Sequence, residues 1–235
     1  YIVSSPQRIT TNKTRIISRN QQMMRLDAEI TADLQPAEED KLLQALHNFL
    51  ITQKPQVLIL EDYNKGVLTE RVIKEAIRLC QQHGVITAVD PKRKNFFAYA
   101  GVHLFKPNLK EVKDALNLLA EPSGVEELNS IHQQLQQQLS HHISFITLSE
   151  KGVYYHDGAQ SQMIPSHRRN IADVSGAGDT VIATAAVVYA ATKDVHLMAQ
   201  LANLAGGLVC EEVGTAAIDA AKLKAECAQV LGFKF

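Results

Sequence analysis

The chain has 235 residues, of which 46% are hydrophobic and 21% are charged, and its formal net charge is -1 at pH 7. A chain of this length and composition can form one large soluble domain with a substantial core. The small net charge gives no reason to expect a nucleic acid or an anionic membrane as a partner, so any affinity for phosphate has to be local.

The three cysteines (Cys80, Cys210 and Cys227) are far apart in the sequence and form no Cys-x-x-Cys pair. They are typical of reduced, buried thiols, so we expect a cytoplasmic protein. No signal peptide and no membrane-spanning run is visible. The chain starts at Tyr1 rather than Met, from which we expect a fragment without its N-terminal part.

Two half-polar strands are predicted near the N-terminus, at residues 15–19 and 23–27, with Asn20-Gln21-Gln22 as the turn. Strands of this kind fit a lid, a surface hairpin or a dimer contact. Alternation along the first strand predicts that Arg15 and Arg19 share one face. We therefore separate residues 1–34, with the lid strands, from a core at 35–235.

The core opens with a helix that begins at Pro36 and carries Glu38, Glu39 and Asp40 in its first turn. Its predicted buried stripe consists of Leu42, Leu46, Phe49 and Leu50.

Strands and helices then alternate. The predicted strands are residues 57–60, 85–89, 102–105 and 143–148, with a small hairpin at 153–155 and 162–164. The predicted helices are residues 69–82, one capped by Asn108, 125–139, 180–191, 196–212 and one from 219. The continuous apolar run at 57–60 indicates a parallel strand that is covered on both faces. The alternation predicts an α/β fold with a largely parallel sheet.

The run Asp173-Val174-Ser175-Gly176-Ala177-Gly178-Asp179 stands directly before the apolar helix at 180–191. Glycines at the start of a helix let backbone N–H groups approach an anion closely. Asp179 beside them could take a proton from an attacking hydroxyl, so the run indicates a phosphoryl-transfer site. In the alternative interpretation the glycines only form a loop, with Asp173 as an ordinary cap.

Polar side chains also follow the predicted strands, where ligands bind in an open α/β sheet. They are Glu61, Asp62, Asp90, the residues at 106–108 and those at 149–151. Each could be a cap or turn residue, but together they favour a site. Nine histidines form no zinc-like spacing, and His141-His142 is predicted to lie on a solvated turn. No Walker A run is present, which argues against a P-loop kinase.

The glycine run resembles the Asp-Thr-x-Gly-Ala-Gly-Asp signature of the ribokinase-like (PfkB) family of sugar kinases, with Val174 in place of Thr. Asp62-Tyr63-Asn64-Lys65-Gly66 resembles the Asp-Tyr-x-Lys-Gly run of this family. The segment at 106–111 resembles its Asn-x-x-Glu motif, and the segment at 147–152 resembles its Thr-x-Gly nucleotide segment, although Ser149 stands where many members have Gly.

The resemblance extends over nearly the whole chain and implies a ribokinase-like, largely parallel sheet flanked by helices, with a small β lid. It implies that ATP and Mg²⁺ bind at the carboxyl end of the sheet. Asp179 is then the general base, and the amides of Gly176, Ala177 and Gly178 form an anion hole. Asn108 and Glu111 would help hold the metal and its waters. The other residues implied to bind nucleotide are Thr147, Ser149, Gly152, Asp173, Asn203 and Gly214, and those implied to bind substrate are Arg15, Arg25, Asp62 and Lys65.

Within the family, the lid segment at 13–27, Asp90-Pro91-Lys92 and the segment at 149–152 look most like heptose-7-phosphate kinases. This resemblance implies transfer to the anomeric hydroxyl of heptose 7-phosphate in lipopolysaccharide-core synthesis, and a homodimer through the lid strands. Such enzymes are often half of a bifunctional kinase/nucleotidyltransferase, but no second catalytic domain is visible here.

Family members begin with a sugar-binding segment that contains a Gly-Gly motif. This chain has no counterpart, so we expect the N-terminal part of the family fold to be missing and this chain alone to be a poor kinase. Two alternatives stay open: a PfkB kinase of another sugar or nucleoside, and a non-catalytic nucleotide-binding module.

Overall fold

The computed structural model describes residues 1–19 and 21–232. The strands are β1 (Asn12–Ser18), β2 (Gln21–Ala28), β3 (Val57–Glu61), β4 (Ile86–Asp90), β5 (Leu104–Phe105), β6 (Ile143–Thr147), β7 (Val153–His156) and β8 (Ser161–Ile164). The helices are α1 (Pro36–Gln53), α2 (Glu70–Gln82), α3 (Leu109–Leu116), α4 (Val125–Leu139), α5 (Ala177–Thr192), α6 (Val195–Val209) and α7 (Ala220–Leu231), with short 3-10 turns η1 (Arg93–Asn95) and η2 (Ser149–Lys151).

The core is one six-stranded sheet in the order β3-β4-β5-β6-β7-β8. Strands β3 to β6 are parallel, and β7 and β8 are antiparallel to their neighbours. The predicted α/β fold with a largely parallel sheet is therefore confirmed. The hairpin of β7 and β8 is part of this main sheet, which its sequence did not indicate.

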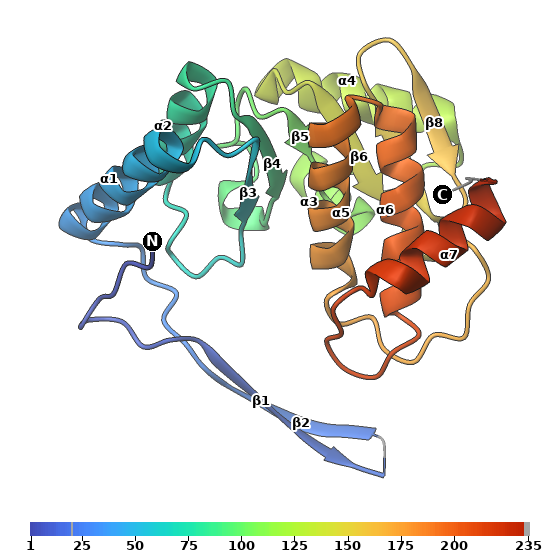
Figure 1. Ribbon diagram of the computed structural model, residues 1–235, viewed down its shortest axis with the longest axis horizontal. Helices are drawn as coiled ribbons and strands as arrows, with labels where there is room; N and C mark the ends of the chain where they lie inside the picture. The colour runs from blue at the N-terminus through green and yellow to red at the C-terminus, as the bar shows by residue number, and fades with distance from the viewer. Residues whose placement is uncertain (20, 233–235) are drawn as a thin grey trace.

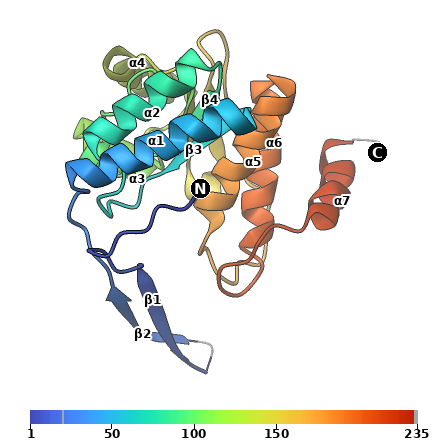
Figure 2. The same cartoon turned by 60° about the vertical axis from the view of Figure 1, so that its left-hand side comes forward.

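Helices cover both faces of the sheet. Neighbouring residues of each buried strand point to opposite faces, so each strand contributes side chains to two separate cores. Val89 and Phe105 pack with α2, α3 and α4, whereas Ala88 and Leu104 pack with α5 and α6. Figure 1 shows α5 and α6 side by side in front of the sheet, with α7 against α6. Figure 2 shows α1 beside α2. No helix within the described ranges is both long and apolar enough to cross a bilayer.

Local capping interactions fix the starts of the predicted helices. Pro36 is the first residue of α1, and the Thr69 side chain accepts the N–H of Val72 at the start of α2. The predicted stripe of α1 was partly wrong: Leu43 and Leu50 are buried, whereas Leu42 is half-buried. The reason is that α1 packs mainly on α2 rather than on the sheet, so it buries a narrower face.

The prediction that the run at 57–60 is a parallel strand covered on both faces is confirmed. Leu58 and Leu60 pack in the core cluster with α2, and Val57 and Ile59 pack in the cluster with α5. β3 is an edge strand of the six-stranded sheet. Leu60 is buried, but Val57, Leu58 and Ile59 are only half-buried. An apolar run reports the preference of a strand for burial and does not report its position in the sheet.

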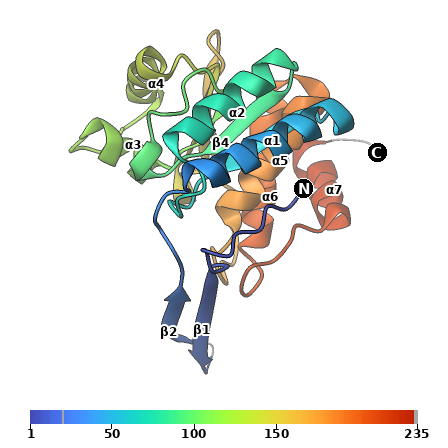
Figure 3. The ribbon, with the colours of Figure 1, turned by 90° about the vertical axis from the view of Figure 1, so that its left-hand side faces the viewer.

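The lid strands pair in a separate two-stranded antiparallel sheet that projects from the body, as Figure 3 shows below the helices. The predicted pair of strands is confirmed, but the predicted turn was too long: Gln21 and Gln22 begin β2 and pair with β1, and Asn20 lies outside the described residues. Arg15 is in register with Arg25. The prediction that Arg19 shares a strand face with Arg15 was wrong, because β1 ends at Ser18 and Arg19 takes a left-handed conformation with φ 48°.

The prediction of a solvated turn at His141-His142 holds for only one of the two residues. His142 is exposed, whereas His141 is 1% exposed. The imidazoles of His132 and His141 both contact Ser144 Oγ, at 2.8 and 2.6 Å, and His132 stacks on His156 at 3.7 Å between ring centres. A buried hydroxyl between two rings satisfies polar atoms that would otherwise lack partners.

This histidine cluster predicts a loss of stability in acid. Burial, and then the neighbouring histidines, lower the pKa of His132 to about 4 and that of His141 to about 3. Below the ordinary histidine pKa of about 6.5, the unfolded state therefore binds more protons than the folded state. The free energy of unfolding that these residues contribute above a pH of about 6.5 is lost as the pH falls toward about 4. Thermal melts between these limits should show Tm falling by about 2–4 °C for each kcal/mol lost. In His132→Gln, which keeps a polar partner for Ser144 without titrating, the slope should flatten; an unchanged slope would contradict this account.

Candidate active site

The carboxyl ends of the parallel strands bring charged residues to one edge of the sheet. Glu61 ends β3 in register with Asp90 at the end of β4. Lys106 follows β5, and Asn108 forms a parallel bridge with Thr147 at the end of β6. The start of α5 lies over this edge, because α5 packs against β3 and β4.

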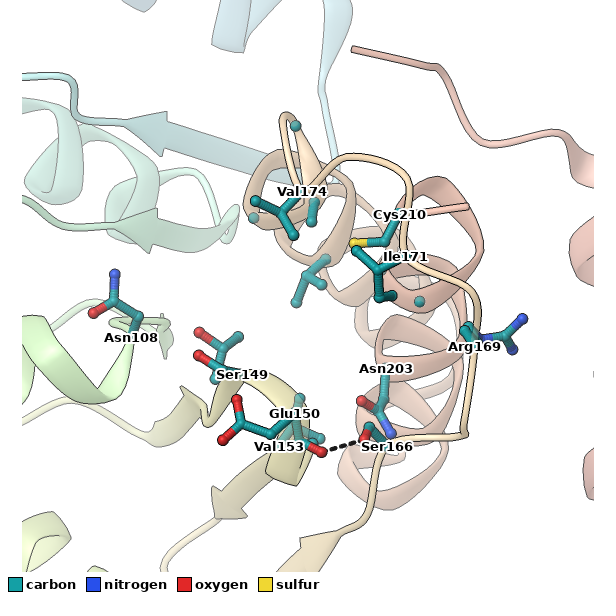
Figure 4. Close-up of a pocket in the computed structure, with 18 of the residues that line it drawn as sticks. Asn108, Ser149, Glu150, Val153, Ser166, Arg169, Ile171, Val174, Asn203 and Cys210 are labelled. Atoms are coloured by element: carbon teal, nitrogen blue, oxygen red, sulfur yellow. Dashed lines mark hydrogen bonds between the residues drawn. The ribbon is translucent and has the colours of Figure 1, made fainter. Parts of the chain in front are cut away.

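A cleft of about 1310 Å³ opens along this edge. Figure 4 shows Val174, Ile171 and Cys210 grouped on one side and Asn108 and Ser149 on the other. The cleft therefore has an apolar wall and a polar wall, as a site for a ring system joined to a charged group would.

The glycine run forms a tight turn into α5, as its sequence predicts. Gly176 is the N-cap, with a left-handed φ of 82°, and the helix begins at Ala177. The Ala177 N–H donates to the carbonyl of Val174 at 3.3 Å. The N–H groups of Gly178 and Asp179 come next and have no acceptor within the helix, and both residues line the cleft at the positive end of the helix dipole.

Asp179, in the same turn, belongs to a group of three carboxylates. Oxygen atoms of Glu61, Asp90 and Asp179 lie within 4.8 Å of one another. The pKa of Glu61 is raised to about 7, first by partial burial of the Glu61 carboxyl and then by the charges of Asp90 and Asp179. Glu61 as a whole residue is nevertheless exposed to solvent. The Tyr63 hydroxyl donates to Asp179 Oδ1 at 2.6 Å.

Two lysines balance part of this negative charge. Lys106 is 2% exposed and its Nζ lies 3.0 Å from Asp90 Oδ2, while Lys92 Nζ lies 3.0 Å from Asp90 Oδ1. Lys92 also contacts Glu111 Oε1 at 2.7 Å. Burial opposes the charge of Lys92, but Asp90 and Glu111 outweigh it and raise the pKa of this ammonium group. The site thus holds fixed positive charge beside the start of α5.

The cleft brings together most of the residues that the sequence predicts to bind nucleotide or to act in catalysis. Those that line it are Gly176, Ala177, Gly178, Asp179, Asn108, Thr147, Ser149, Gly152 and Asn203. The residues predicted for the site that do not line it are Glu111, Asp173, Gly214, Arg15, Arg25, Asp62 and Lys65.

Several of these other residues support the cleft walls. Asp173 accepts the N–H groups of Ser175 and Gly214, at 2.9 and 3.1 Å, so it ties the glycine turn to the loop after α6. Hydrogen bonds from the backbone, first that of Ser175, lower the pKa of the Asp173 carboxyl. Glu111 and Asn108 form a capping box at the start of α3, with both bonds at 2.8 Å.

The four predicted sugar ligands do not line the cleft, and Lys65, Arg25 and Asp62 have partners of their own. Lys65 pairs with Glu29 at 2.6 Å, and Arg25 pairs with Asp27 at 2.9 Å. Both oxygens of the buried Asp62 accept hydrogen bonds within its own surroundings. Their role in substrate binding stays a prediction.

The sequence interpretation missed Tyr63 and gave Lys106 no specific role. Lys106 stands directly before Pro107-Asn108 at a strand end, so its position was a usable signal. Tyr63 and Asp179 are 116 residues apart, and no local pattern links them.

Comparison with known proteins identifies a family and several relatives of this chain. The sequence matches the pfkB family of carbohydrate kinases over residues 1–222. It is 38% identical over 232 residues to "Bifunctional protein HldE" of Granulibacter bethesdensis, covering 96% of this chain and 47% of that protein. It is 39% identical over 225 residues to the protein of the same name in Caulobacter vibrioides, covering 95% of this chain and 45% of that protein. The chain thus spans about half the length of these curated relatives.

Solved structures show the same fold. Phosphofructokinase-2 from Escherichia coli superposes with a TM-score of 0.75 at 16% identity, covering 88% of this chain and 66% of that one. Ribokinase from Giardia lamblia superposes with a TM-score of 0.71 at 16% identity, covering 95% of this chain and 72% of that one. With this fold and the family match over residues 1–222, the chain belongs to the pfkB family of carbohydrate kinases.

Proposed function

We propose that this chain is the kinase part of an enzyme that transfers the γ-phosphoryl group of ATP to the anomeric hydroxyl of heptose 7-phosphate. The observation that carries the proposal is the start of α5, where unpaired N–H groups and Asp179 face a cleft with one apolar wall. The reaction would take place in the cytoplasm, on a precursor of the lipopolysaccharide core.

In the proposed reaction Asp179 accepts the proton of the sugar hydroxyl as the oxygen attacks the γ-phosphorus. The bond from this oxygen to phosphorus forms, and the bond from phosphorus to the bridging oxygen of ADP breaks. The amides of Gly176, Ala177 and Gly178 stabilise the charge on the transferring group. Since the Ala177 N–H already has an acceptor in Val174, the neighbouring amides would carry most of this stabilisation. Lys106 adds a buried positive charge nearby.

Mg²⁺ fits the oxygen-rich donors of this edge of the sheet. Asn108 and Glu111 each already accept a hydrogen bond in the capping box, and Glu111 also holds Lys92. This arrangement supports a role for these two residues through water rather than by direct contact. The metal would neutralise charge on the nucleotide phosphates.

A phosphorylated sugar is favoured by the lid. Arg15 and Arg25 are directly opposite each other in the hairpin. Like charges in such a cross-strand pair cost free energy. Asp27 offsets part of this cost at Arg25, and a bound anion would offset more of it. Guanidinium groups bind phosphate in a bidentate manner, so this pair suits the 7-phosphate.

Phosphoryl transfer by the full-length protein to a panel of acceptors tests which substrate is used. With ATP-Mg²⁺ we expect heptose 7-phosphate to be preferred over the free heptose, other sugar phosphates and nucleosides. A preference for an unphosphorylated sugar or a nucleoside would overturn the substrate and leave the kinase class. Binding of ATP without turnover of any acceptor would favour the non-catalytic alternative.

A homodimer through the lid strands belongs to the same proposal. The hairpin exposes apolar side chains on both strands, namely Ile16, Ile17, Met23, Met24 and Leu26. A second copy would cover them, and sedimentation of the wild-type chain against Ile17→Lys should show the loss of the dimer.

A further inference from the structure

Tyr63 connects the loop after β3 with the carboxylate at the start of α5. Its hydroxyl donates to Asp179 Oδ1 at 2.6 Å. In the part of the chain that the structure describes, no other side chain hydrogen-bonds this carboxylate. Burial, and then the hydrogen bond to Asp179, raise the pKa of the Tyr63 phenol, so the hydroxyl remains a donor at neutral pH.

The loop that carries Tyr63 is held firmly in place. Asp62 is 3% exposed; its Oδ1 accepts the N–H of Asn64 at 2.8 Å and its Oδ2 accepts the Tyr99 hydroxyl at 2.8 Å. Asn64 takes a left-handed conformation with φ 53°. A side chain on so constrained a loop has little freedom left to lose, so Tyr63 is preorganised to meet Asp179.

The lid reaches the same tyrosine. Lys13 Nζ lies 5.6 Å from the centre of the Tyr63 ring, within the range of a cation–π contact. Lys13 is half-buried, whereas the other residues of β1 are exposed. The base of the lid hairpin therefore meets the body of the protein at the residue that holds Asp179.

Asp179 needs a hydrogen bond that fixes its carboxylate, because neighbouring carboxylates repel it. The carboxylates of Glu61 and Asp90 lie within 4.8 Å of it, and like charges at this distance repel. The two lysines of the site pair with Asp90 rather than with Asp179. The bond from Tyr63 engages one oxygen of Asp179 and leaves the other for the hydroxyl of an acceptor.

We propose that Tyr63 is the positioning residue for the catalytic carboxylate. The Tyr63 hydroxyl donates to Asp179 Oδ1 and so orients Oδ2 to take the proton of the acceptor hydroxyl. Because Lys13 of the lid contacts the Tyr63 ring, the orientation of Asp179 depends on the position of the lid. The inference rests on the proposed kinase function, to which it adds a residue that acts through Asp179 and not on the substrate itself.

Tyr63→Phe in the full-length protein is the direct test, because it keeps the ring beneath Lys13 and removes only the hydroxyl. We expect kcat to fall by about tenfold to hundredfold, as for a misplaced catalytic group, with ATP affinity unchanged. The matched control is Tyr189→Phe: Tyr189 lies on α5, also carries a lysine over its ring at 5.4 Å, and does not line the cleft. It should keep the wild-type kcat. Lys13→Met should lower kcat less than Tyr63→Phe does. Lys13→Arg keeps a cation over the ring and should have the kcat of the wild type.

A double-mutant cycle separates positioning from a general structural role. In an Asp179→Asn background, loss of the Tyr63 hydroxyl should cost almost nothing further in single-turnover rate, because the group that it positions no longer accepts a proton. A full additional loss, or an unchanged kcat in Tyr63→Phe alone, overturns the proposal.

Crystal structures of the wild type and Tyr63→Phe keep the two proposals distinguishable. We expect the Asp179 carboxylate to leave its wild-type rotamer in the variant. An Asp179 that stays in place would overturn the positioning role whatever the activity is. Failure of the full-length protein to phosphorylate any sugar phosphate would instead count against the proposed function.

Discussion

Asp179→Asn is expected to abolish phosphoryl transfer while ATP binding remains nearly intact. The amide keeps the shape of the side chain and can still accept the hydrogen bond from Tyr63, but it cannot take a proton. General base catalysis contributes about 10²–10⁴-fold, so kcat should fall by that order. The measurement is the rate of ADP formation beside calorimetric titration with ATP on the same preparation.

Asp194→Asn is the matched control for this substitution. Asp194 caps α6 by accepting the N–H of Leu197 at 2.9 Å, and it does not line the cleft. Asn is an equally good N-cap residue, so both stability and rate should be retained. A full rate in Asp179→Asn would remove Asp179 from the role of base.

Gly176→Val should impair both ATP binding and turnover. Gly176 has a φ of 82°, and a Cβ at this position would lie 2.9 Å from Thr215 Cγ2. A left-handed conformation costs a residue with a side chain about 1–2 kcal/mol, and a β-branched residue tolerates it least. The turn should therefore reshape and withdraw its N–H groups from the phosphate position. Nucleotide titration and thermal melts of the same variant measure the two effects.

The control is Gly158→Val, in the connection between β7 and β8. Gly158 has a φ of 93°, a Cβ at this position would meet no described atom within 4 Å, and the residue lies outside the cleft. This variant should lose similar stability but keep its affinity for ATP. Equal ATP affinity in Gly176→Val and the wild type would show that this glycine serves the fold alone.

The order of the core elements could be predicted because local signals agree with the tertiary structure. Thr69 caps α2, Asn108 and Glu111 form the expected box at α3, and apolar runs mark the buried strands. The position of each strand in the sheet could not be predicted, because it depends on pairing between distant segments. Thus β3 is at an edge, and β7 and β8 extend the main sheet.

Several residues that line the cleft could be predicted for a similar reason. The glycine turn, Asn108 and Thr147 lie in short segments with recognisable spacing, and the topology of the sheet brings their ends together. The contact from Tyr63 to Asp179 and the burial of His141 follow from packing alone. A sequence pattern states which side chains are polar, but it does not state which distant partner each one meets.

The lid hairpin has a consequence for hydrogen exchange. Its two strands pair only with each other among the described strands, and an isolated two-stranded hairpin is marginally stable in water. Backbone amides of β1 and β2 should therefore exchange with deuterium rapidly, whereas those of the buried β4 should exchange only in rare, large openings. Slow exchange in the hairpin at higher protein concentration would report directly that another surface covers it, without any need for a substrate.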